Sequence, residues 1–547
     1  MSGVLPTVHV PEEFTAEERT RLEPFFSNPD RHVFALRNLP ETVKGALFAR
    51  YSRSAKSLRR LFLDEFADKV PHTGVQPGSV GGSTAVERAE RLYARVFSEY
   101  GDDSVAQLGG AHVACEYVSN VLTKVLEWGR LMAYLEQSTR YVPYTDKRNG
   151  QWRYHVPVEL GEGALRTEYV RTMDAAFECY AAWIPRMQEH FAARHPRGAS
   201  DSDAVHRAAI RAKALDTLRG LLPAATQSNV GIFGTGQGYE ALLLRMRASP
   251  LQEVRDCADD ILRELRTVMP AFLTRVDQPE RGGRWTAYLG STRTAVEKVA
   301  AELLGGLESG PAEEVTLTGF DAEGEIKVVA AALYAASALP DHQLQDVARR
   351  LTPDERARVL RAYVGERANR RHRPGRAFER TSYRFDVLTD YGAFRDLQRH
   401  RLLTIEWQPL SSRHGFTEPA AIVEAGGRDD WQRVMDASAA LYERLHSGGF
   451  AGVAPYAVAM AYRVRFYMDM NAREAMHVIE LRSAPQGHPA YRRVCQRMHR
   501  LIADGAGHHA IAAAMSFADH THVELERLGA ERALEARRAR LENEAAG

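Results

Sequence analysis

The sequence has no excess of charge of either sign. Its 547 residues include 72 Lys and Arg and 71 Asp and Glu, which give a formal net charge of +1. A chain so close to neutrality creates no overall field that would draw it to nucleic acid or to an anionic membrane surface. Any site that binds an anion must therefore be built locally, from side chains that the fold brings together.

Cysteine and long hydrophobic runs are scarce as well. The four cysteines, at positions 115, 179, 257 and 495, are far apart and form no Cys-x-x-Cys pair, so the sequence has neither zinc-ligand spacing nor a dithiol couple. The N-terminus has no basic stretch followed by an apolar core, and the longest uncharged apolar run, Val328–Pro340, is shorter than the roughly 20 residues of a membrane helix. These absences predict a cytoplasmic protein with reduced thiols.

What the chain does contain is helical periodicity. Apolar residues recur at helical spacing in residues 39–70, 85–101 and 113–137, which predicts helices there. The stretch 151–160 is rich in aromatic and branched residues and predicts a strand, and further helices are expected up to about Phe272. Helix should therefore dominate the first half of the chain.

The length predicts two to four domains, because one domain typically takes about 150 residues. Glycine-rich punctuation across residues 277–314 predicts a linker, and residues 314–336 are expected to form a new strand and then a helix. We accordingly divide the chain into an N-terminal half, 1–290, and a C-terminal half, 291–547.

The two halves are similar to each other. Lys44–Ser52 matches Ile326–Ser337, and each half later has a helical stretch that leads to an Arg, then a Glu, a Gln, a Ser and an Arg. The later repeat reads GRLMAYLEQSTRY at 129–141 and HRLLTIEWQPLSSRH at 400–414. The pattern predicts a duplicated domain of about 250 residues, a period too long for a solenoid. Two copies in one chain predict an intramolecular pseudo-dimer.

Arg399, His400 and Arg401 form the most concentrated group of cationic and protonatable side chains. Adjacent helical residues point about 100° apart, so the three suit a helix end that a ligand can approach from several sides. Two guanidiniums offer forked donors to phosphate or carboxylate, and the imidazole adds another donor. The alternative is a solvated basic helix end stabilised by the helix dipole.

A second candidate group follows in DMNAREAMHVIELR. Arg473 and His477 are four residues apart and share one face of the expected helix, whereas Asn471 and Arg482, eleven apart, share another. Asn471 with Glu474 also has the spacing of a capping box, so it is expected to cap the helix, alone or in addition to contacting a ligand.

The first half has a third group, in which Glu136, Gln137, Ser138 and Arg140 are followed by Tyr141. Such a segment can orient a nucleotide through its phosphate and base edges, or it can be a turn with ordinary capping. GIFGTGQGYE, residues 231–240, lacks the G-x-G-x-x-G fingerprint and predicts a loop. The remaining histidines form neither a Ser-His-Asp order nor a metal-type His-Glu cluster, so no metal is expected.

Together these segments resemble the flavin-dependent thymidylate synthases. That family's signature is Arg-His-Arg, then a Glu-x-Ser-x-Arg-Tyr or Gln-Ser-x-Arg-Tyr segment, and downstream an Asn-Ala-Arg helix that ends in Arg. The resemblance implies an α+β fold in two tandem copies, each helix-rich around a small mixed or antiparallel sheet. It also implies FAD as cofactor, NADPH and methylenetetrahydrofolate as co-substrates, and C5 methylation of dUMP to dTMP. No protein nucleophile is then required, because the cofactor carries the difficult chemistry.

The resemblance assigns different tasks to the two halves. The C-terminal half matches the flavin-binding positions at Arg399, His400, Arg401, Asn471, Arg473 and His477, and the nucleotide-contacting position at Arg482. The N-terminal half matches the nucleotide-binding positions at Glu136, Gln137, Ser138, Arg140 and the phosphate-binding Arg219. We expect Arg482, Arg401 and His400 to be the catalytic residues.

Each half lacks what the other keeps. Trp128, Gly129 and Arg130 replace the triplet in the first half, and residues 235–237 replace its Asn-Ala-Arg. The second half lacks the phosphate-binding Arg, and its Ser411-Ser412-Arg413-His414 follows a Pro-containing insertion. The resemblance therefore implies one composite active site per chain, with two chains pairing as a homodimer that recreates the family's tetramer.

Two departures leave the substrate open. The family's Gln before the triplet is Asp396 here, and an aspartate near a phosphate would repel it. The family's His after Glu379 is Arg380. The alternatives are therefore C5 modification of another pyrimidine nucleotide, UMP or a cytosine nucleotide, and a non-catalytic relative that binds flavin or nucleotide.

Overall fold

The computed structural model describes residues 13–29, 34, 36–51, 56–69, 107–307, 310 and 312–546. The chain forms two compact units, each assembled from several segments. Unit 1 comprises Met1–Cys115, Leu131–Leu135 and Val230–Leu307, and unit 2 comprises Glu116–Arg130, Glu136–Asn229 and Glu308–Gly547. All the candidate site residues, from Glu136 to Arg219 and from Arg399 to Arg482, belong to unit 2.

Unit 1 is mainly helical. Its helices are α1 (Ala16–Leu22), α2 (Glu41–Tyr51), α3 (Leu58–Glu65), α8 (Gly236–Arg247), α9 (Gln252–Val268) and α10 (Arg284–Leu304), with short turns η1 (Ala67–Lys69), η5 (Pro270–Leu273) and η6 (Pro279–Gly283). Helix α9 buries Val254, Ile261 and Leu265 along one face, as the helical period requires.

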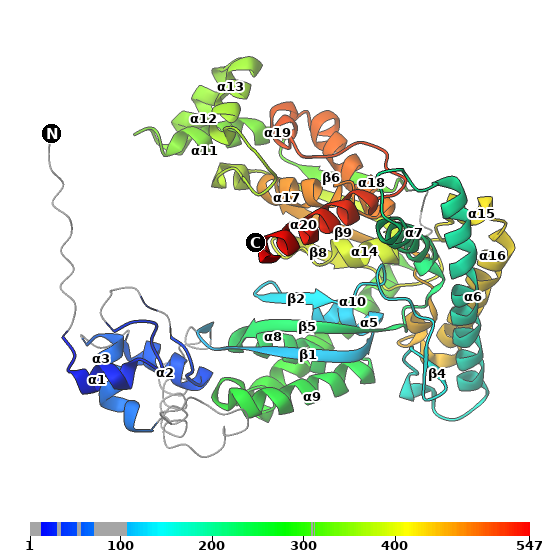
Figure 1. Ribbon diagram of the computed structural model, residues 1–547, viewed down its shortest axis with the longest axis horizontal. Helices are drawn as coiled ribbons and strands as arrows, with labels where there is room; N and C mark the ends of the chain where they lie inside the picture. Colours follow the sequence, from blue (N-terminus) through cyan, green and yellow to red (C-terminus); the bar gives the residue numbers. More distant parts are fainter. Residues whose placement is uncertain are drawn as a thin grey trace. The chain divides into compact units, whose positions relative to one another are not determined.

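Unit 2 combines helices with a sheet (Figure 1), and α14, α17 and α18 contact strand β7 of that sheet. Its helices are α5 (Asn120–Leu126), α6 (Ala164–Arg194), α7 (Asp203–Leu218), α11 (Gly324–Tyr334), α12 (Asp341–Arg350), α13 (Pro353–Val364), α14 (Tyr391–Leu397), α15 (Ala420–Glu424), α16 (Arg428–Leu445), α17 (Ala472–Arg482), α18 (Pro489–Arg500), α19 (His509–Ala514) and α20 (Leu528–Ala546). Short turns are η3 (Val158–Leu160), η4 (Arg219–Leu221), η7 (Arg376–Arg380), η8 (His446–Phe450), η9 (Ala454–Ala457) and η10 (Leu501–Gly505). Helices α6 and α16, one from each half of the sequence, pack side by side (Figure 1).

The main sheet of unit 2 is antiparallel and has the order β6-β7-β9-β8. Its strands are β6 (Val315–Phe320), β7 (Ser382–Asp390), β8 (Thr404–Trp407) and β9 (Arg463–Asn471). Alternate residues of β9 are buried, from Val464 to Met470, so one face of the strand packs on the core. Opposite Asn471, at the end of β9, lies Ser382, where β7 begins.

The same strand order occurs earlier in the chain. Strands β1 (Gly110–Ser119), β5 (Gln227–Thr235) and β2 (Met132–Glu136) form a sheet in the order β1-β5-β2, which repeats β7-β9-β8. A small hairpin pairs β3 (Lys147–Arg148) with β4 (Gln151–Trp152). The repeated order confirms the predicted α+β fold in two tandem copies with small antiparallel sheets.

The strand-to-helix junctions repeat as well. Ser119 caps α5 after β1 as Asp390 caps α14 after β7, and Thr235 caps α8 after β5 as Asn471 caps α17 after β9. In each case a side-chain oxygen accepts a hydrogen bond from a backbone N–H of the first helical turn. These four caps fix where each helix starts relative to its sheet.

Several local predictions were wrong at these junctions. Residues 113–137 form β1, α5 and β2 rather than one helix, because the branched and aromatic residues of this stretch pack into a sheet that its periodicity did not reveal. Residues 231–240 are the end of β5 and the start of α8, not a loop. The cue that was overlooked is the N-cap Thr235.

The predicted linker was also wrong. Residues 279–304 form η6 and the 21-residue helix α10, in which no residue is buried. Of residues 151–160, only Gln151–Trp152 is a strand. By contrast, the helices α2 and α3 and the strand and helix after 314 are confirmed. The helix predicted at 85–101 lies outside the described residues.

The described cysteines are all free thiols. Among the described residues, no helix is both long enough and apolar enough to cross a membrane.

Candidate active site

Two short helices of the C-terminal half present the motif residues. Helix α14 starts at its cap, Asp390, and ends just before the triplet Arg399–Arg401. Helix α17 starts at its cap, Asn471, whose Oδ1 accepts the N–H of Glu474, and ends at Arg482. The capping role expected for Asn471 is therefore present. The adjacent strands β7 and β9 bring the two helices together.

His400 lies where the two helices meet, with 8% of its surface exposed. Its Nε2 accepts a hydrogen bond from Nε of Arg482 at 2.9 Å, and its Nδ1 lies 3.6 Å from Oε1 of Glu474. Burial, together with Arg482, holds the pKa of His400 well below its usual range. The imidazole is thus neutral, and because Nε2 is the acceptor, its proton is on Nδ1 and faces Glu474.

His477 completes this group, which we call the imidazole cluster: His400, Glu474 and His477. The two rings are 5.4 Å apart, and Nη2 of Arg373 approaches Nδ1 of His477 at 2.8 Å. Burial, with Arg373 second, lowers the pKa of His477 to about 4, and burial raises the pKa of Glu474 to about 7. Every titratable group in the cluster is thus shifted towards its neutral form.

The imidazole cluster also has the composition of a metal site, a grouping that the sequence reasoning missed. One ligand atom from each of its three residues lies within 4.8 Å of the others. Its surroundings do not suit a cation, however. Arg482 and Arg373 direct guanidinium groups at the two rings, and Arg401 and Arg473 add positive charge close to Glu474.

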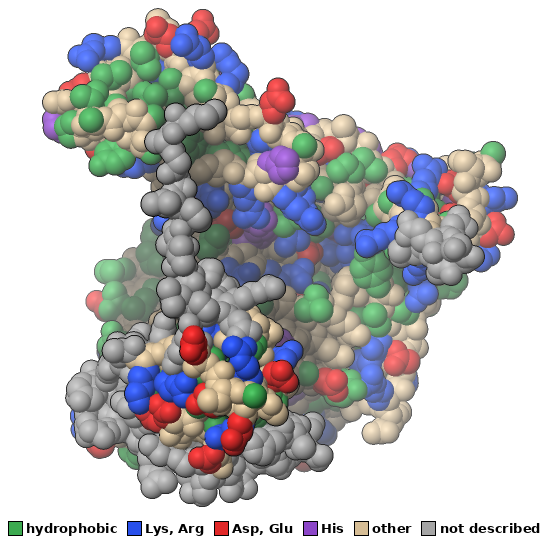
Figure 2. Space-filling model, turned by 60° about the vertical axis from the view of Figure 1, so that its left-hand side comes forward, with side chains coloured by type: hydrophobic (Ala, Val, Ile, Leu, Met, Phe, Trp, Pro, Cys, Tyr) green, Lys and Arg blue, Asp and Glu red, His purple; other side chains and the backbone are tan. Residues whose placement is uncertain are grey.

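The same surroundings suit an anionic cofactor. Arg473 donates from Nε to the carbonyl oxygen of Pro374 and lies 3.5 Å from Glu379, while Arg373 and Arg401 are exposed. Cationic side chains also gather beside histidine on the face shown in Figure 2. Guanidinium groups are what the pyrophosphate of FAD would need. Arg399, His400 and Arg401 follow α14, and Asn471, Arg473 and His477 cap or belong to α17. Their role in binding FAD stays a prediction.

The N-terminal half supplies a buried acid and an arginine to the same region. Glu136, which is 9% exposed, accepts from Nη2 of Arg395 at 2.6 Å and from Nζ of Lys124 at 3.5 Å. Burial alone would raise the pKa of Glu136, but Arg395 and Lys124 outweigh it and lower the pKa to about 2. Gln137 and Ser138 follow at the end of β2, where Oγ of Ser138 accepts the N–H of Arg140.

Arg140 reaches from the N-terminal half to the C-terminal half. Its Nε lies 2.8 Å from both carboxylate oxygens of Asp216 on α7. Its Nη1 donates to the carbonyl oxygen of Gln486 at 3.2 Å and lies 3.5 Å from the hydroxyl of Tyr491. Arg482 lies over the ring of that same tyrosine, 5.5 Å from its centre. Arg140 and Arg482, predicted to serve one nucleotide, are therefore neighbours.

Arg219, at the end of α7, is 4% exposed and only loosely paired. Its Nη1 lies 3.6 Å from Asp396 and its Nη2 lies 4.0 Å from Asp390, and Nη2 has no hydrogen-bond partner among the described residues. Gly392 allows the close approach, because a Cβ there would stand 2.9 Å from Nε of Arg219. A buried donor without a partner is costly, so this group is poised to bind an anion.

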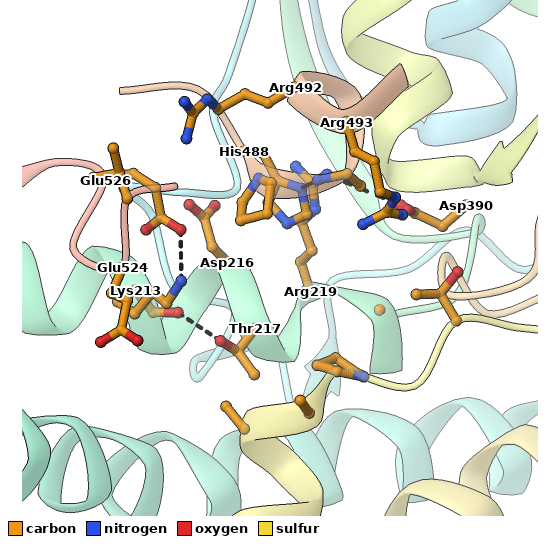
Figure 3. A pocket seen from close by; sticks show the side chains of 18 of the residues that line it. Lys213, Asp216, Thr217, Arg219, Asp390, His488, Arg492, Arg493, Glu524 and Glu526 are labelled. Carbon is orange, nitrogen blue, oxygen red and sulfur yellow. Dashed lines mark hydrogen bonds and ion pairs between the residues drawn. The ribbon is translucent and has the colours of Figure 1, made fainter. Parts of the chain in front are cut away.

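Two cavities meet at Arg219. A small one of about 40 Å³ is lined by residues of both halves: Glu136, Gln137, Ser138, Thr139, Arg140, Arg219, Gly392, Arg395, Asp396 and Arg399. We call it the arginine cavity. A larger one of about 580 Å³ has Lys213, Asp216, Arg219 and His488 in its wall (Figure 3). The larger volume is within the range of small-molecule sites, and the smaller has room for a group of only a few atoms.

The position related to this site by the duplication carries other side chains. Trp128, at the place of Arg399, packs edge-on against Trp407 with ring centres 5.3 Å apart. Arg130, at the place of Arg401, donates to the hydroxyl of Thr404 at 3.0 Å. In the other half, Oγ of Ser411 accepts the N–H of Arg413 and so is engaged within its own turn.

Several residues at the site were missed from sequence. Lys124, Asp216, Arg395, Tyr491 and Arg373 contact the motif residues but belong to no motif. Arg395, one helical turn before Arg399, had a usable signal, since it shares a face with that residue. The others come from distant segments, and only the fold brings them here.

The chain is similar to known proteins along most of its length. A family model described as thymidylate synthase complementing protein matches residues 49–271 and 317–506. A UPF0159 protein of Chlamydia pneumoniae is 35% identical over 522 residues, which cover 95% of this chain and 98% of that protein. A UPF0159 protein of Thermoplasma acidophilum is 31% identical over 514 residues, 89% of this chain and 97% of that protein.

Among solved structures, a UMP/dUMP methylase PolB from Streptomyces cacaoi bound with 5-Br dUMP is 20% identical, with a TM-score of 0.29. It matches 36% of this chain and 94% of that chain. The family match, by contrast, falls once in each half of the sequence and together covers most of it. The chain therefore belongs to the thymidylate synthase complementing family, the flavin-dependent thymidylate synthases, as a tandemly duplicated member.

Proposed function

We propose that the protein is a flavin-dependent enzyme that methylates C5 of dUMP to give dTMP, at one composite active site per chain. The half formed by residues 1–290 binds the nucleotide phosphate, and the half formed by residues 291–547 binds FAD. One observation carries the proposal. Arginines of both halves, Arg140 and Arg219 from one and Arg399 from the other, line the same small cavity.

The proposed roles follow from charge and position. Arg219 offers its free Nη2 to a phosphate oxygen, and Ser138 and Arg140 add donors at the same cavity. Arg482 lies between the arginine cavity and the imidazole cluster, since it pairs with Asp396 at 3.6 Å and with His400 at 2.9 Å. It therefore orients the pyrimidine towards the cofactor while its half-buried guanidinium is held in a fixed direction.

Reduced FAD supplies the reducing equivalents when bound, with NADPH as their source and methylenetetrahydrofolate as the one-carbon donor. Residues of this chain bind and orient the cofactor. Arg399, Arg401 and Arg473 bind its anionic part, and Asn471 and His477 lie beside them. His400, neutral and protonated on Nδ1, keeps Arg482 in place by accepting its hydrogen bond.

Complementation of a thymidine auxotroph tests this proposal. Arg140→Ala and Arg401→Ala should abolish growth, because each removes one half's contribution to the single site. Cells with the Arg130→Ala variant should still grow, because Arg130 stands at the position related by the duplication, outside the proposed site, and donates to Thr404. Equal failure of Arg130→Ala would contradict the single-site proposal. The purified protein should be yellow, and a colourless protein that takes up no FAD would overturn the enzymatic proposal altogether.

A second candidate keeps the cofactors and changes the nucleotide to UMP or a cytosine nucleotide. Asp396, in the place of the family's Gln, favours it, because this residue borders the arginine cavity directly. Tritium release from 5-labelled dUMP, UMP and dCMP under reducing conditions separates the two candidates. Release from UMP or dCMP in preference to dUMP would establish the second.

We further propose that the chain is a homodimer, through helix α10. Large apolar side chains on this helix are more than half exposed at Trp285, Tyr288, Val296, Val299 and Leu303. Their spacings of three, eight, three and four residues place all five on one face of the helix, and such an apolar face can pack against another helix of the same kind. A second copy of the chain supplies that helix.

A further inference from the structure

Asp396 is an anion already present where the substrate's phosphate is proposed to bind. Its Oδ1 accepts from Nη2 of Arg399 at 2.7 Å and lies 3.6 Å from Arg482, and its Oδ2 lies 3.6 Å from Arg219. Burial alone would raise the pKa of this carboxyl, but Arg399, Arg482, Arg219 and Arg140 together hold it far below its usual range. The arginine cavity thus contains a permanent negative charge.

The other arginines of the cavity also have carboxylate partners. Asp216 pairs with Arg140, Glu136 with Arg395, and Asp390 lies 4.0 Å from Arg219. Lys124, which lies 3.5 Å from Glu136, is itself paired with Glu127 at 2.6 Å. The buried cations are therefore six, those of Lys124, Arg140, Arg219, Arg395, Arg399 and Arg482, and they face five carboxylates, those of Glu127, Glu136, Asp216, Asp390 and Asp396. The remaining groups near Asp396 are His400, His488 and Tyr491, and the two histidines have pKa values held well below their usual range, so they are neutral.

The excess of positive charge is therefore about one. A singly charged ligand balances it, whereas a dianion would leave an uncompensated negative charge beside Asp396 in a buried site, which is costly. A phosphate monoester has its second pKa near 6 and so can take up a proton at neutral pH at small cost. Sulfate cannot take up a proton at neutral pH. The protonated phosphate also offers an O–H donor, and a carboxylate is an acceptor.

We propose that Asp396 determines the specificity of the site for a phosphate monoester that carries a proton, shared on binding between a phosphate oxygen and the Asp396 carboxylate. This inference rests on the proposed nucleotide site and deepens it. The proton comes from solvent, no covalent bond changes, and the bound ligand has one negative charge. Asp396 then selects nucleoside monophosphates and excludes sulfate.

Titration calorimetry of the purified holoenzyme tests the proposal. Binding of dUMP, measured at pH 7.5 in two buffers of different ionisation enthalpy, should take up close to one proton per nucleotide. Between pH 7 and pH 8 the affinity should fall about tenfold, because the protonated form of the phosphate becomes tenfold rarer above its pKa of about 6. Inorganic phosphate should compete with dUMP, and sulfate should not.

Asp396→Asn should bind dUMP with no proton uptake and should lose the discrimination against sulfate. Asp341→Asn is the matched control, because Asp341 is also paired with an arginine, Arg380, but is half exposed. Proton uptake of zero in the wild type, or uptake unchanged in Asp396→Asn, would overturn the inference and leave the nucleotide site standing. Absence of dUMP binding in the wild type and in every variant would overturn both this inference and the proposed nucleotide site. If Asp396→Asn does not fold, proton uptake by the wild type and the comparison of phosphate with sulfate still test the inference.

Discussion

Arginine is the residue on which this site depends, because its guanidinium stays charged however deeply it is buried. Arg219 shows the consequence. It has no tight counter-ion, and Nη2 has no partner among the described residues, although only 4% of the residue is exposed. Folding leaves this donor unsatisfied, and an arriving anion would satisfy it. A charge-assisted hydrogen bond of this kind is worth about 1.5–3 kcal/mol.

Gly392→Ala should weaken nucleotide binding. The new Cβ would stand 2.9 Å from Nε of Arg219, so this guanidinium must move from its position in the arginine cavity. Loss of one charge-assisted bond predicts roughly a tenfold to hundredfold weaker dUMP affinity by calorimetry. Gly290→Ala on α10, where no atom lies within 4 Å of the new Cβ, should leave the affinity unchanged. An unchanged affinity in Gly392→Ala would mean that Arg219 does not bind the phosphate.

Glu136→Gln should alter how stability depends on pH. The folded-state pKa of Glu136 is about 2, below its ordinary value of 4.5. Its ionised form therefore stabilises the fold above pH 4.5, and this contribution is lost as the pH falls from 4.5 towards 2. Breaking this buried pair with Arg395 should cost about 3 kcal/mol at pH 7.

Urea unfolding at a series of pH values measures the effect. The difference between wild type and Glu136→Gln should be largest at neutral pH and shrink in acid. Glu406→Gln is the comparison at the related position, where the carboxylate is exposed and should contribute little. A difference that does not shrink in acid would show that the ionised form of Glu136 is not what stabilises the protein.

At the scale of elements, the strand-to-helix junctions carry the site and were the part least visible in the sequence. Helical spacing located α2 and α3 correctly, because buried apolar residues recur there at three- and four-residue intervals: Val43, Ala46 and Leu47 in α2, and Leu58, Leu61 and Phe62 in α3. It failed for β1, α5 and β2, because apolar residues of these strands lie on both faces, as exposed Leu135 and buried Met132 do in β2, and so do not reveal the strand period. The motif residues themselves were found, but their neighbours Asp216 and Arg373 come from segments whose approach depends on the whole fold.

Asn471→Ala and Thr235→Ala separate capping from ligand binding. Both residues cap a helix that follows a strand, α17 and α8, with equivalent side-chain hydrogen bonds. Each substitution should therefore cost about 1 kcal/mol of stability. Only Asn471→Ala should also weaken FAD binding, measured from flavin absorbance after dialysis. Equal retention of FAD by both variants would limit Asn471 to a structural role.

At the scale of the whole molecule, duplication lets one copy lose what the other keeps. At the position related to the C-terminal triplet, Trp128 packs against Trp407, where the C-terminal half has charged side chains. The sequence comparison between the halves predicts this division, because the missing residues are visible when the two repeats are compared, and it stays a prediction. The sequence did not reveal helix α10, because its glycine-rich flanks were interpreted as a linker.

Helix α10 should hold two chains together. The exposed seam at Tyr288, Val296 and Leu303 would be buried between two copies, and a charge placed in it would be desolvated at a cost that weakens the dimer. The wild type should sediment at twice the chain mass of 61.1 kDa, and Val296→Glu together with Leu303→Glu should sediment as a monomer. Thr294→Glu, on the other side of the helix, is the control and should stay dimeric. A wild-type monomer at micromolar concentration would contradict the dimer, and a dimer that survives both seam substitutions would place its interface elsewhere.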